Sequence, residues 1–358
     1  MQGRNSQISA AWVQMSGPSD DVAVSTRARL ARNVQWSVFP SHASDADLKR
    51  VVDVVLQTLR ESDDSIERFR VINPASLSEF ERLALVNAHL ASRRQVDGGR
   101  YRPIVVNEEG SLSMMVNEED HLRMQCILPG FQPLFALEKV QGLDNYIGSK
   151  IGYATTDNYG YLTTSLANIG TGLRVSVMLH LAGLSFMGEA VELLAAAAEL
   201  KISVRGLFGE GSKAVGDLFQ VSNETTIGFT EREITSRVRA AAEHLIRRER
   251  EARQRAITER KTDLIRVVRR AGERLLESDS LSGPEAMTCL SILRLGTEAG
   301  LTPAISSRLF SELLASMQME VTSFKGSAGK PWSMGNDIWR AGMVREKLAG
   351  CRPVVGRG

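Results

Sequence analysis

The chain has few cysteines and no long apolar segment. Its 358 residues include only three cysteines, which are far apart in the sequence: Cys126, Cys289 and Cys351. They form neither a CxxC metal-binding pair nor a disulfide framework, so a reducing cytoplasm is the expected environment. No apolar run reaches the roughly 18 residues that a membrane helix needs, and residues 1–14 lack the pattern of a signal peptide. A membrane location is therefore not expected.

Lysine is also scarce, because only 9 of the 44 basic residues are lysine and the other 35 are arginine. The formal net charge is +2, so no overall field favours nucleic acid or an anionic membrane as a partner. Arginine makes planar, forked contacts to phosphate and carboxylate groups. A GC-rich genome would produce the same bias, so the arginine content alone does not indicate a phosphate site.

Two common nucleotide-binding motifs are missing. The sequence contains no GxxxxGK[ST] segment, and no GxGxxG opens a helix after a strand. If the chain binds a nucleotide, it must do so without a P-loop or a dinucleotide-binding fold.

The apolar spacing predicts a mixture of helices and strands. Helices are predicted at 44–62, 76–92, 131–151 and 189–200, with Ser44 and either Ser76 or Ser78 as N-caps. Strands are predicted at 69–74, 102–107, 112–117, 121–128, 202–208 and 218–223, with a hairpin at 153–165 and a glycine-rich turn leading into a strand within 166–184.

The chain is almost entirely helical from Glu231 onward. Apolar residues recur at helical spacing on one face: Ile234, Val238, Leu245, Ala252 and Ala256. The other positions are charged, and acids alternate with the arginines, which is typical of a solvated face and not of a nucleic-acid surface. A boundary near Arg260 separates this region from a small helical domain.

An ionic cluster interrupts the strand region. The segment "NEEDHLRMQC", residues 117–126, brings three acids, His121 and Arg123 into seven positions. By itself such a cluster indicates a solvated face as readily as a site. Other arginines have distinctive local settings, in "VSTRARLARN", at the start of "RVSVM" and in "VRGLFGE": Arg27, Arg29, Arg174 and Arg205. As a set these arginines suit a triphosphate, because several planar forks neutralise a polyanion and fix its direction.

Four segments occur in the order typical of one enzyme family: "VSTRARLARN", "NEEDHLRMQ", "NIGTGLRVSVMLHL" and "VRGLFGEGS…QVSNETTIG". Over residues 20–260 the chain resembles the phosphagen (guanidino) kinases, and within them the bacterial protein-arginine kinases. The resemblance implies an α+β fold in which an antiparallel sheet is flanked by helices, with a helical C-terminal domain. It divides the chain into an N-terminal segment (1–20), a catalytic domain (21–260) and a helical domain (261–358).

The resemblance also implies an ATP site. The first nucleotide-binding segment comprises Ser25, Thr26, Arg27, Ala28 and Arg29. His89, expected on the second helix, matches a histidine that contacts adenine. The rest of the phosphate cradle comprises Arg123, Arg174, Val175, Ser176, Val177, Met178, Arg205, Gly206, Leu207, Phe208, Gly209 and Glu210.

The same resemblance assigns roles to the acids. A guanidinium is protonated in water and is a poor nucleophile, so a kinase must orient it and accept a proton. Glu119 and Glu210 match the family's two substrate-clamping glutamates. Glu118 is expected to order Mg²⁺ through water, with the ion held mainly by ATP and by no protein ligand directly. Asp120 and His121 are expected to orient the loop, and the reaction is direct phosphoryl transfer.

The chain departs from the family pattern in two places. Ser165, in "SLAN", stands where the family's "CPTN" has a reactive cysteine, which removes a thiolate near the guanidinium without forbidding the chemistry. In "NDIWRA" Asp337 and Arg340 match a phosphoarginine-binding motif, but Asn336 replaces its first arginine. A site that lacks one of its two guanidinium groups is expected to bind phosphate weakly.

The substrate expected from the resemblance is protein. Kinases of free guanidino compounds have a long helical region ahead of the first arginine motif, whereas only about two dozen residues precede "VSTRAR" here. The expected function is phosphorylation of proteins with accessible arginines, which marks them for a Clp-type unfoldase and protease, with an activating adaptor and a homodimer as further partners. Two alternatives stay open: a kinase of a free guanidino compound, and a regulator that binds nucleotide or phosphoarginine without catalysis.

Overall fold

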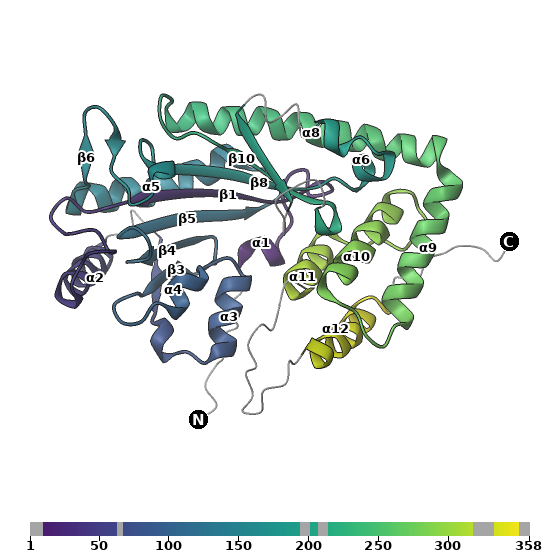
Figure 1. Ribbon diagram of the computed structural model, residues 1–358, viewed down its shortest axis with the longest axis horizontal. Helices are drawn as coiled ribbons and strands as arrows, with labels where there is room; N and C mark the ends of the chain where they lie inside the picture. Colours follow the sequence, from purple (N-terminus) through teal and green to yellow (C-terminus); the bar gives the residue numbers. More distant parts are fainter. Residues whose placement is uncertain (1–9, 63–66, 194–200, 207–213, 318–332, 351–358) are drawn as a thin grey trace. The chain divides into compact units, whose positions relative to one another are not determined.

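The computed structural model describes residues 10–62, 67–193, 201–206, 214–317 and 333–350 (Figure 1). Its main sheet has eight strands in the order β2-β3-β4-β5-β1-β8-β10-β9. These strands are β1 (Ala23–Arg32), β2 (Phe69–Ile72), β3 (Ile104–Asn107), β4 (Leu112–Val116), β5 (Leu122–Pro129), β8 (Leu173–His180), β9 (Ile202–Gly206) and β10 (Leu218–Asn223). The pairs β1–β5, β2–β3, β3–β4 and β4–β5 are antiparallel. The α+β fold with an antiparallel sheet is confirmed.

The chain forms two compact units. The first comprises Met1–Pro18, Ser25–Val177 and Ser222–Ala240, and the second comprises Ser19–Val24, Met178–Val221 and Ala241–Gly358. The domain boundary expected near Arg260 coincides with the junction of two helices, α8 (Glu231–Glu259) and α9 (Lys261–Glu277). As a domain boundary it stays a prediction.

Besides the start of α8, the described part of the first unit contains five helices. They are α1 (Ala11–Gln14), α2 (Asp45–Arg60), α3 (Glu79–Asn87), α4 (Arg93–Asp97) and α5 (Pro133–Ile151). Three of them, α2, α3 and α4, begin at a serine cap. Ser44 forms a capping box with Asp47 at the start of α2. Of the two candidate caps of α3, Ser78 is the one used, and Ser76 belongs to the short 3-10 turn η1 (Pro74–Ser76). Helix α5 packs against β5, and α2 packs against α5.

Strand alternation divides the residues of β1 between two faces of the sheet. Leu30 pairs with Met124, and Ala28 pairs with Cys126, which in turn pairs with Leu112 of β4. These side chains are buried, and they form an apolar face of the sheet. Cys126 is therefore a core residue of its strand, as expected. Ser25, Arg27 and Arg29 alternate with them and belong to the opposite face.

A small two-stranded sheet lies between α5 and β8 in the sequence. Strands β6 (Thr155–Thr156) and β7 (Gly160–Tyr161) are antiparallel, which confirms the predicted hairpin. Tyr161 also exchanges backbone hydrogen bonds with Gly170, at 2.8 and 3.2 Å. The glycine-rich segment that precedes β8 is thereby attached to the hairpin.

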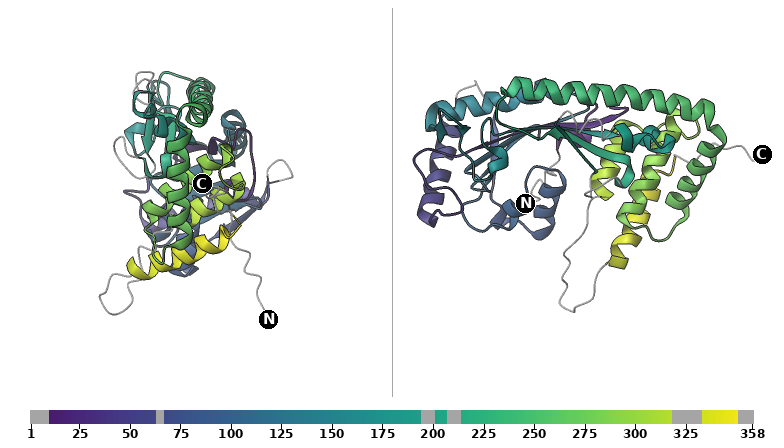
Figure 2. Two further views of the ribbon diagram at one scale, coloured as in Figure 1. Left: turned by 90° about the vertical axis from the view of Figure 1, so that its right-hand side faces the viewer. Right: turned by 45° about the horizontal axis from the view of Figure 1, so that its top comes forward.

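The long helix α8 is uninterrupted over its 29 residues (Figure 2). Thr230 caps its first turn, since the Thr230 hydroxyl accepts from the amide of Glu233 and the Glu233 carboxylate accepts from the amide of Thr230. The five apolar positions that the sequence predicted for the buried face are all buried: Ile234, Val238, Leu245, Ala252 and Ala256.

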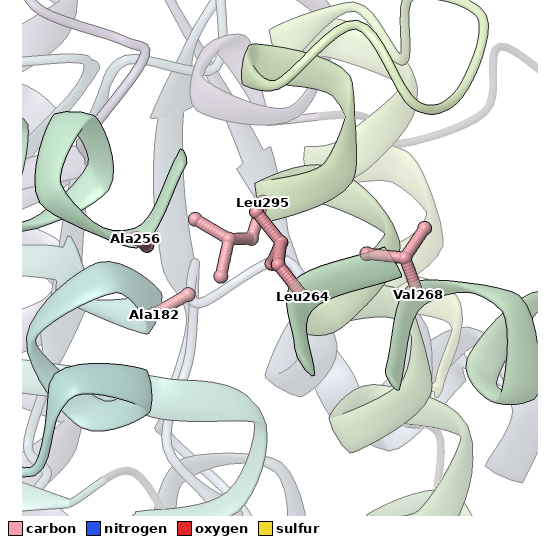
Figure 3. Close-up of a cluster of buried hydrophobic side chains, with 5 residues drawn as sticks. All are labelled: Ala182, Ala256, Leu264, Val268 and Leu295. Carbon is pink, nitrogen blue, oxygen red and sulfur yellow. The ribbon is translucent and has the colours of Figure 1, made fainter. Parts of the chain in front are cut away.

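The second unit is mainly helical in its described part. Besides α9 and the end of α8 it contains α6 (Ala182–Met187), α10 (Gly283–Glu298), α11 (Ser307–Met317) and α12 (Ser333–Lys347). A cluster of buried apolar side chains joins α6, α8, α9 and α10 (Figure 3): Ala182, Ala256, Leu264, Val268 and Leu295. The helical C-terminal part is confirmed. Of the helix predicted at 189–200, residues 190–193 are helical, residue 189 precedes the helix, and residues 194–200 lie outside the described residues.

Candidate nucleotide and guanidinium site

Three arginines share one face of the sheet. On neighbouring antiparallel strands, Arg27 pairs with Ile127, Arg29 with Gln125, and Ala31 with Arg123. Directly paired residues have side chains on the same face, and so do residues two positions apart along a strand. Arg27, Arg29 and Arg123 therefore form a positively charged surface, which we call the arginine face. Thr26 and Ala28, also expected in the nucleotide-binding segment, point to the opposite face.

The arginine face carries positive charge that the protein only partly balances. Burial, together with repulsion from Arg123 and Arg174, lowers the pKa of Arg27 to about 9. Burial lowers the pKa of Arg29 well below its ordinary value too, with further repulsion from Arg27, Arg123 and Arg174 and a smaller opposing effect of Glu118. Cations in such surroundings are stabilised by a bound anion. The repulsion among these arginines would favour a polyanionic ligand on this face.

Arg174 adds to this charge from β8. Its Nη2 donates to the hydroxyl of Ser222 at 3.3 Å. The following residues, Val175, Ser176 and Val177, are buried within the strand. The amide of Val175 donates to Oδ1 of Asn223 at 2.8 Å, which attaches this end of β8 to the end of β10. Arg174 is thus held on a rigid strand.

Gln125 is a contact of the site that the sequence did not indicate. Its Oε1 accepts from Nε of Arg27 at 3.0 Å and also from Nη2. Its Nε2 donates to the carbonyl of His89 at 2.6 Å and to the hydroxyl of Ser113 at 2.8 Å. The side chain is fully buried. A neutral amide therefore orients Arg27 without cancelling its charge.

His89 was expected on a helix, and this placement is wrong. Helix α3 ends at Asn87, and His89 follows it in the left-handed region with φ 58°. Its ring lies 5.5 Å from that of Trp12, whose Nε1 donates to the carbonyl of Ala88. Burial, with repulsion from Arg27 and Arg29, lowers the pKa of His89 to about 4. The imidazole is neutral at pH 7.

The acid cluster forms the turn between β4 and β5. The amide of Asn117, at φ 58°, donates to the carbonyl of His121 at 2.8 Å and closes the turn. Glu118 is buried; it accepts from the Ser92 hydroxyl at 2.6 Å, from Arg123 at 3.0 Å and from the amide of Glu119 at 2.8 Å. Although burial opposes it, these bonds hold the pKa of Glu118 below its ordinary value.

Asn33 holds the turn from the end of β1. Its amide nitrogen donates to Oδ1 of Asp120 at 2.7 Å, and its Oδ1 accepts from the amide of His121 at 2.9 Å. Nδ1 of His121 accepts from the amide of Val34, so Nε2 carries the hydrogen and donates to the carbonyl of Val38 at 3.1 Å. Asp120 and His121 therefore orient the turn, while Glu119 remains partly exposed.

The segment that contains Ser165 is attached to the same turn. The Thr164 hydroxyl donates to the carbonyl of Glu119 at 2.9 Å, and the Thr164 amide donates to Oδ1 of Asp120 at 2.7 Å. Ser165 follows directly, at the start of a short 3-10 turn, η2 (Leu166–Asn168). The structure thus brings Ser165 close to the turn that carries Glu119.

Two family models match the chain. One describes the ATP:guanido phosphotransferase C-terminal catalytic domain and matches residues 50–252. The chain belongs to the ATP:guanido phosphotransferase family. The second describes the C-terminal domain of the protein-arginine kinase McsB and matches residues 261–354. The resemblance found in the sequence is confirmed.

Relatives of this guanidino kinase extend over nearly the whole chain. A protein-arginine kinase of Halalkalibacterium halodurans is 38% identical over 309 residues, covering 86% of this chain and 87% of the relative. Those of Moorella thermoacetica and Bacillus subtilis are 36% and 34% identical, covering 97% and 95% of this chain and 99% and 93% of theirs.

Solved structures support the fold. A lombricine kinase aligns with a TM-score of 0.58 at 22% identity, covering 69% of this chain and 73% of that one. A duplicated taurocyamine kinase of Schistosoma mansoni aligns with a TM-score of 0.56 at 24% identity, covering 65% of this chain and 33% of that one. At these identities the likeness concerns the fold alone.

Several expected site residues of the guanidino kinase belong to the second unit or lie outside the described residues. Met178, Arg205 and Gly206 belong to the second unit, where Arg205 is exposed and its Nε donates to the hydroxyl of Ser203 at 3.2 Å. Four further residues of this loop lie outside the described residues: Leu207, Phe208, Gly209 and Glu210. Of the two expected clamp glutamates, only Glu119 is therefore placed.

The expected phosphoarginine-binding residues lie on α12 of the second unit. The buried Arg340 donates from Nη1 to the carbonyl of Leu281 at 2.7 Å and to Oδ1 of Asp337 at 2.6 Å. The side chain of Asn336 lies outside the described part. Asp337 and Arg340 are thus paired with each other, and this pair occupies Nη1 of the Arg340 guanidinium.

Arg32 is an arginine of "VSTRARLARN" for which the sequence predicted no role. It is fully buried, and its Nη2 lies 2.7 Å from Oδ2 of Asp144 and 3.1 Å from Oε1 of Glu231. Its Nη1 donates to the carbonyl of Thr171 at 2.8 Å, and the guanidinium lies 3.6 Å from the ring centroid of Tyr161. Arg32 joins α5, α8, the hairpin and the glycine-rich segment. The alternation of side chains along β1 could have indicated this different role. Arg32 is an odd number of residues from Arg27 and Arg29, so it falls on the opposite face of the sheet.

No described helix is long and apolar enough to span a bilayer. Among the described residues, no group of three or more His, Cys, Asp or Glu side chains could hold a metal ion.

Proposed function

We propose that this chain transfers the γ-phosphate of ATP to the guanidinium of arginine side chains in proteins. The observation that carries the proposal is the arrangement on one sheet face: Arg27, Arg29 and Arg123 lie beside the turn that presents Glu119. The relatives named protein-arginine kinase, which match along nearly the whole chain, support protein as the substrate.

The arginine face accounts for the phosphate half of the reaction. Its like charges are brought together at an electrostatic cost, which is seen in the lowered pKa values of Arg27 and Arg29. A bound triphosphate offsets that cost, and further negative charge on the transferring group strengthens the interaction. The neutral His89, whose ring is tilted against that of Trp12, is suited to contact an uncharged base, and Arg205 with Gly206 would complete the cradle.

Glu119 accounts for the acceptor half. Its carboxylate is partly exposed, while the backbone of its turn is held by Asn33, Thr164 and Glu118. A carboxylate fixed in this way can hold the guanidinium in line with the phosphate and accept its proton as the N–P bond forms. Glu210 is proposed as the second clamp, and Ser165 would lie beside the guanidinium.

Glu118 fits the role of ordering Mg²⁺ through water. Its Oε2 is saturated by Arg123 and the amide of Glu119, but Oε1 accepts only from Ser92 among the described residues and keeps a lone pair for a water molecule. Its lowered pKa keeps it ionised at pH 7. When bound, Mg²⁺ would neutralise phosphate charge, and ATP itself would supply most of its ligands.

The proposal extends to the chain's cellular role. Cytoplasmic phosphorylation of proteins with accessible arginines would mark them for a Clp-type unfoldase, with an adaptor and a homodimer as further partners. Binding of phosphoarginine near Asp337 and Arg340 would be weak, because Arg340 already donates to Asp337 and Leu281.

Incubation with Mg-ATP and either an unstructured arginine-containing protein or free arginine tests the proposal. Mass spectrometry should detect acid-labile phosphate on arginine of the protein and little or none on the free amino acid. Label on the free amino acid alone would assign the chain to free guanidino compounds. Absence of label on both, with ATP still bound, would leave a binding protein.

A further inference from the structure

Leu166 is an unusual residue for its position. It follows Ser165 directly, and its side chain is 82% exposed, the largest exposed fraction among the large apolar side chains of the described residues. Full exposure of a leucine is not by itself informative. Here it occurs one residue from the group proposed to lie beside the target guanidinium, and the turn with Glu119 holds its segment in place through Thr164.

A second exposed apolar residue lies on the neighbouring segment. Ile227 is 51% exposed. The Thr226 hydroxyl donates to the carbonyls of Ile169 at 2.6 Å and Ala167 at 3.3 Å, and the amide of Thr171 donates to the carbonyl of Thr226 at 3.0 Å. A Cβ atom at Gly170 would meet Cγ1 of Ile227 at 2.9 Å. These bonds and contacts hold Leu166 and Ile227 on adjoining segments.

The two segments carry no charge of their own, although the Arg237 guanidinium lies 3.9 Å from the ring centroid of Phe229. Residues 163–172 and 225–229 contain no charged side chain. Two exposed apolar side chains on a rigid, uncharged support favour apolar residues of a ligand, because burying them removes apolar surface from water. The segment is rigid because its backbone groups are bonded to the acid turn on one side and to Thr226 on the other.

We propose that Leu166 and Ile227 are specificity-determining residues that bind apolar side chains next to the target arginine of a protein substrate. This proposal rests on the proposed function, because it takes the arginine to be held at Glu119. An extended polypeptide advances about 3.3 Å per residue. The immediate neighbours of an arginine held at Glu119 would therefore pass the side chain that follows Ser165. The favoured substrate is an extended segment in which apolar residues flank arginine, as an unfolded protein exposes.

The test compares two peptides of equal length and charge, each with one central arginine, flanked by leucine in one and by serine in the other. Phosphate transfer from Mg-ATP is measured as kcat/KM for each peptide. The wild-type protein should prefer the leucine peptide by roughly five- to tenfold, the size expected for partial burial of a leucine side chain. In Leu166→Ser this ratio should fall to about one, and in Ile227→Ser it should be reduced.

Val71→Ser is the matched control, because Val71 on β2 is as exposed as Ile227. This variant should keep the wild-type ratio. General damage to the loop would lower kcat/KM for both peptides and leave their ratio unchanged, so the ratio separates recognition from stability. A wild-type ratio near one, or an unchanged ratio in Leu166→Ser, would overturn the inference while the kinase activity stands. Label on free arginine but on neither peptide would overturn the proposed function and this inference with it.

Discussion

Arg27 and Gln125 form the link between the charged face and the loop after α3. The guanidinium donates twice to Oε1 of Gln125, with the Nε bond at 3.0 Å, and the same amide donates to the carbonyl of His89. Arg123, in contrast, is paired with the carboxylate of Glu118. Arg27 is thus fixed in direction by a neutral group that does not cancel its charge.

We expect Gln125→Leu to weaken ATP binding by roughly ten- to thirtyfold, because Arg27 loses its orienting acceptor and the loop at His89 loses a hydrogen bond, each of which contributes about 1 kcal/mol. The maximal rate should change less than the KM for ATP. Steady-state kinetics over a range of ATP concentrations would measure both.

Ser113→Ala is the matched control for Gln125→Leu. It removes another hydrogen-bond partner of Gln125 and leaves the bonds to Arg27 and His89 intact. Its KM for ATP should stay close to the wild-type value. Equal weakening in both variants would show that packing around Gln125, not the orientation of Arg27, determines affinity.

Glu119→Gln should reduce phosphate transfer by roughly a hundredfold or more, since general base catalysis typically contributes that much. ATP binding should persist, because Glu119 is not paired with any arginine of the face in the described structure. Isothermal titration with ATP and a phosphoarginine assay on the same preparation would separate the two effects. Normal transfer in this variant would refute the clamp role.

The parts of the fold that the sequence predicts are those that local interactions determine. Ser44 and Ser78 cap their helices through hydrogen bonds three residues away, and alternation along β1 separates Arg27 and Arg29 from Ala28 and Leu30. Such features can be predicted because they depend on residues two or three positions apart in the sequence.

The features that escaped prediction depend on contacts between residues far apart in sequence. His89 continues an apolar pattern that reads as helix, but Trp12 and Gln125 bind the backbone at Ala88 and His89, and the chain leaves the helix there. Nothing close to Arg32 in sequence indicates Asp144, which is 112 residues away. Tertiary partners of this kind cannot be inferred from local spacing.

Asp144→Asn should destabilise the first unit strongly. Arg32 is fully buried, and removing one carboxylate leaves its charge undercompensated, which typically costs about 3 to 5 kcal/mol. Urea denaturation would measure the change in the free energy of unfolding. Asp53→Asn breaks the exposed Lys49–Asp53 pair on α2 and should change little. Similar small losses in both variants would mean that Glu231 alone suffices to balance Arg32.

His121 should make the fold sensitive to mild acid. Burial lowers its pKa to about 4, against the opposing bond to the carbonyl of Val38. Protonation would also add a hydrogen to Nδ1, which accepts from the amide of Val34. The folded state thus excludes a proton that the unfolded state binds near pH 6.5. The contribution of the neutral His121 to the free energy of unfolding is fully present above pH 6.5 and is lost as the pH falls toward 4.

His121→Gln tests this by removing the titrating group. Between pH 6.5 and 4 the wild-type free energy of unfolding should fall more steeply than that of the variant, by about 1.4 kcal/mol per pH unit for one proton. Urea denaturation at several pH values gives both slopes. The variant also loses packing, so its stability at pH 7 is lower, but the difference in slope reports the proton alone. Parallel slopes would show that His121 is protonated in the folded state or that the loop opens before it titrates.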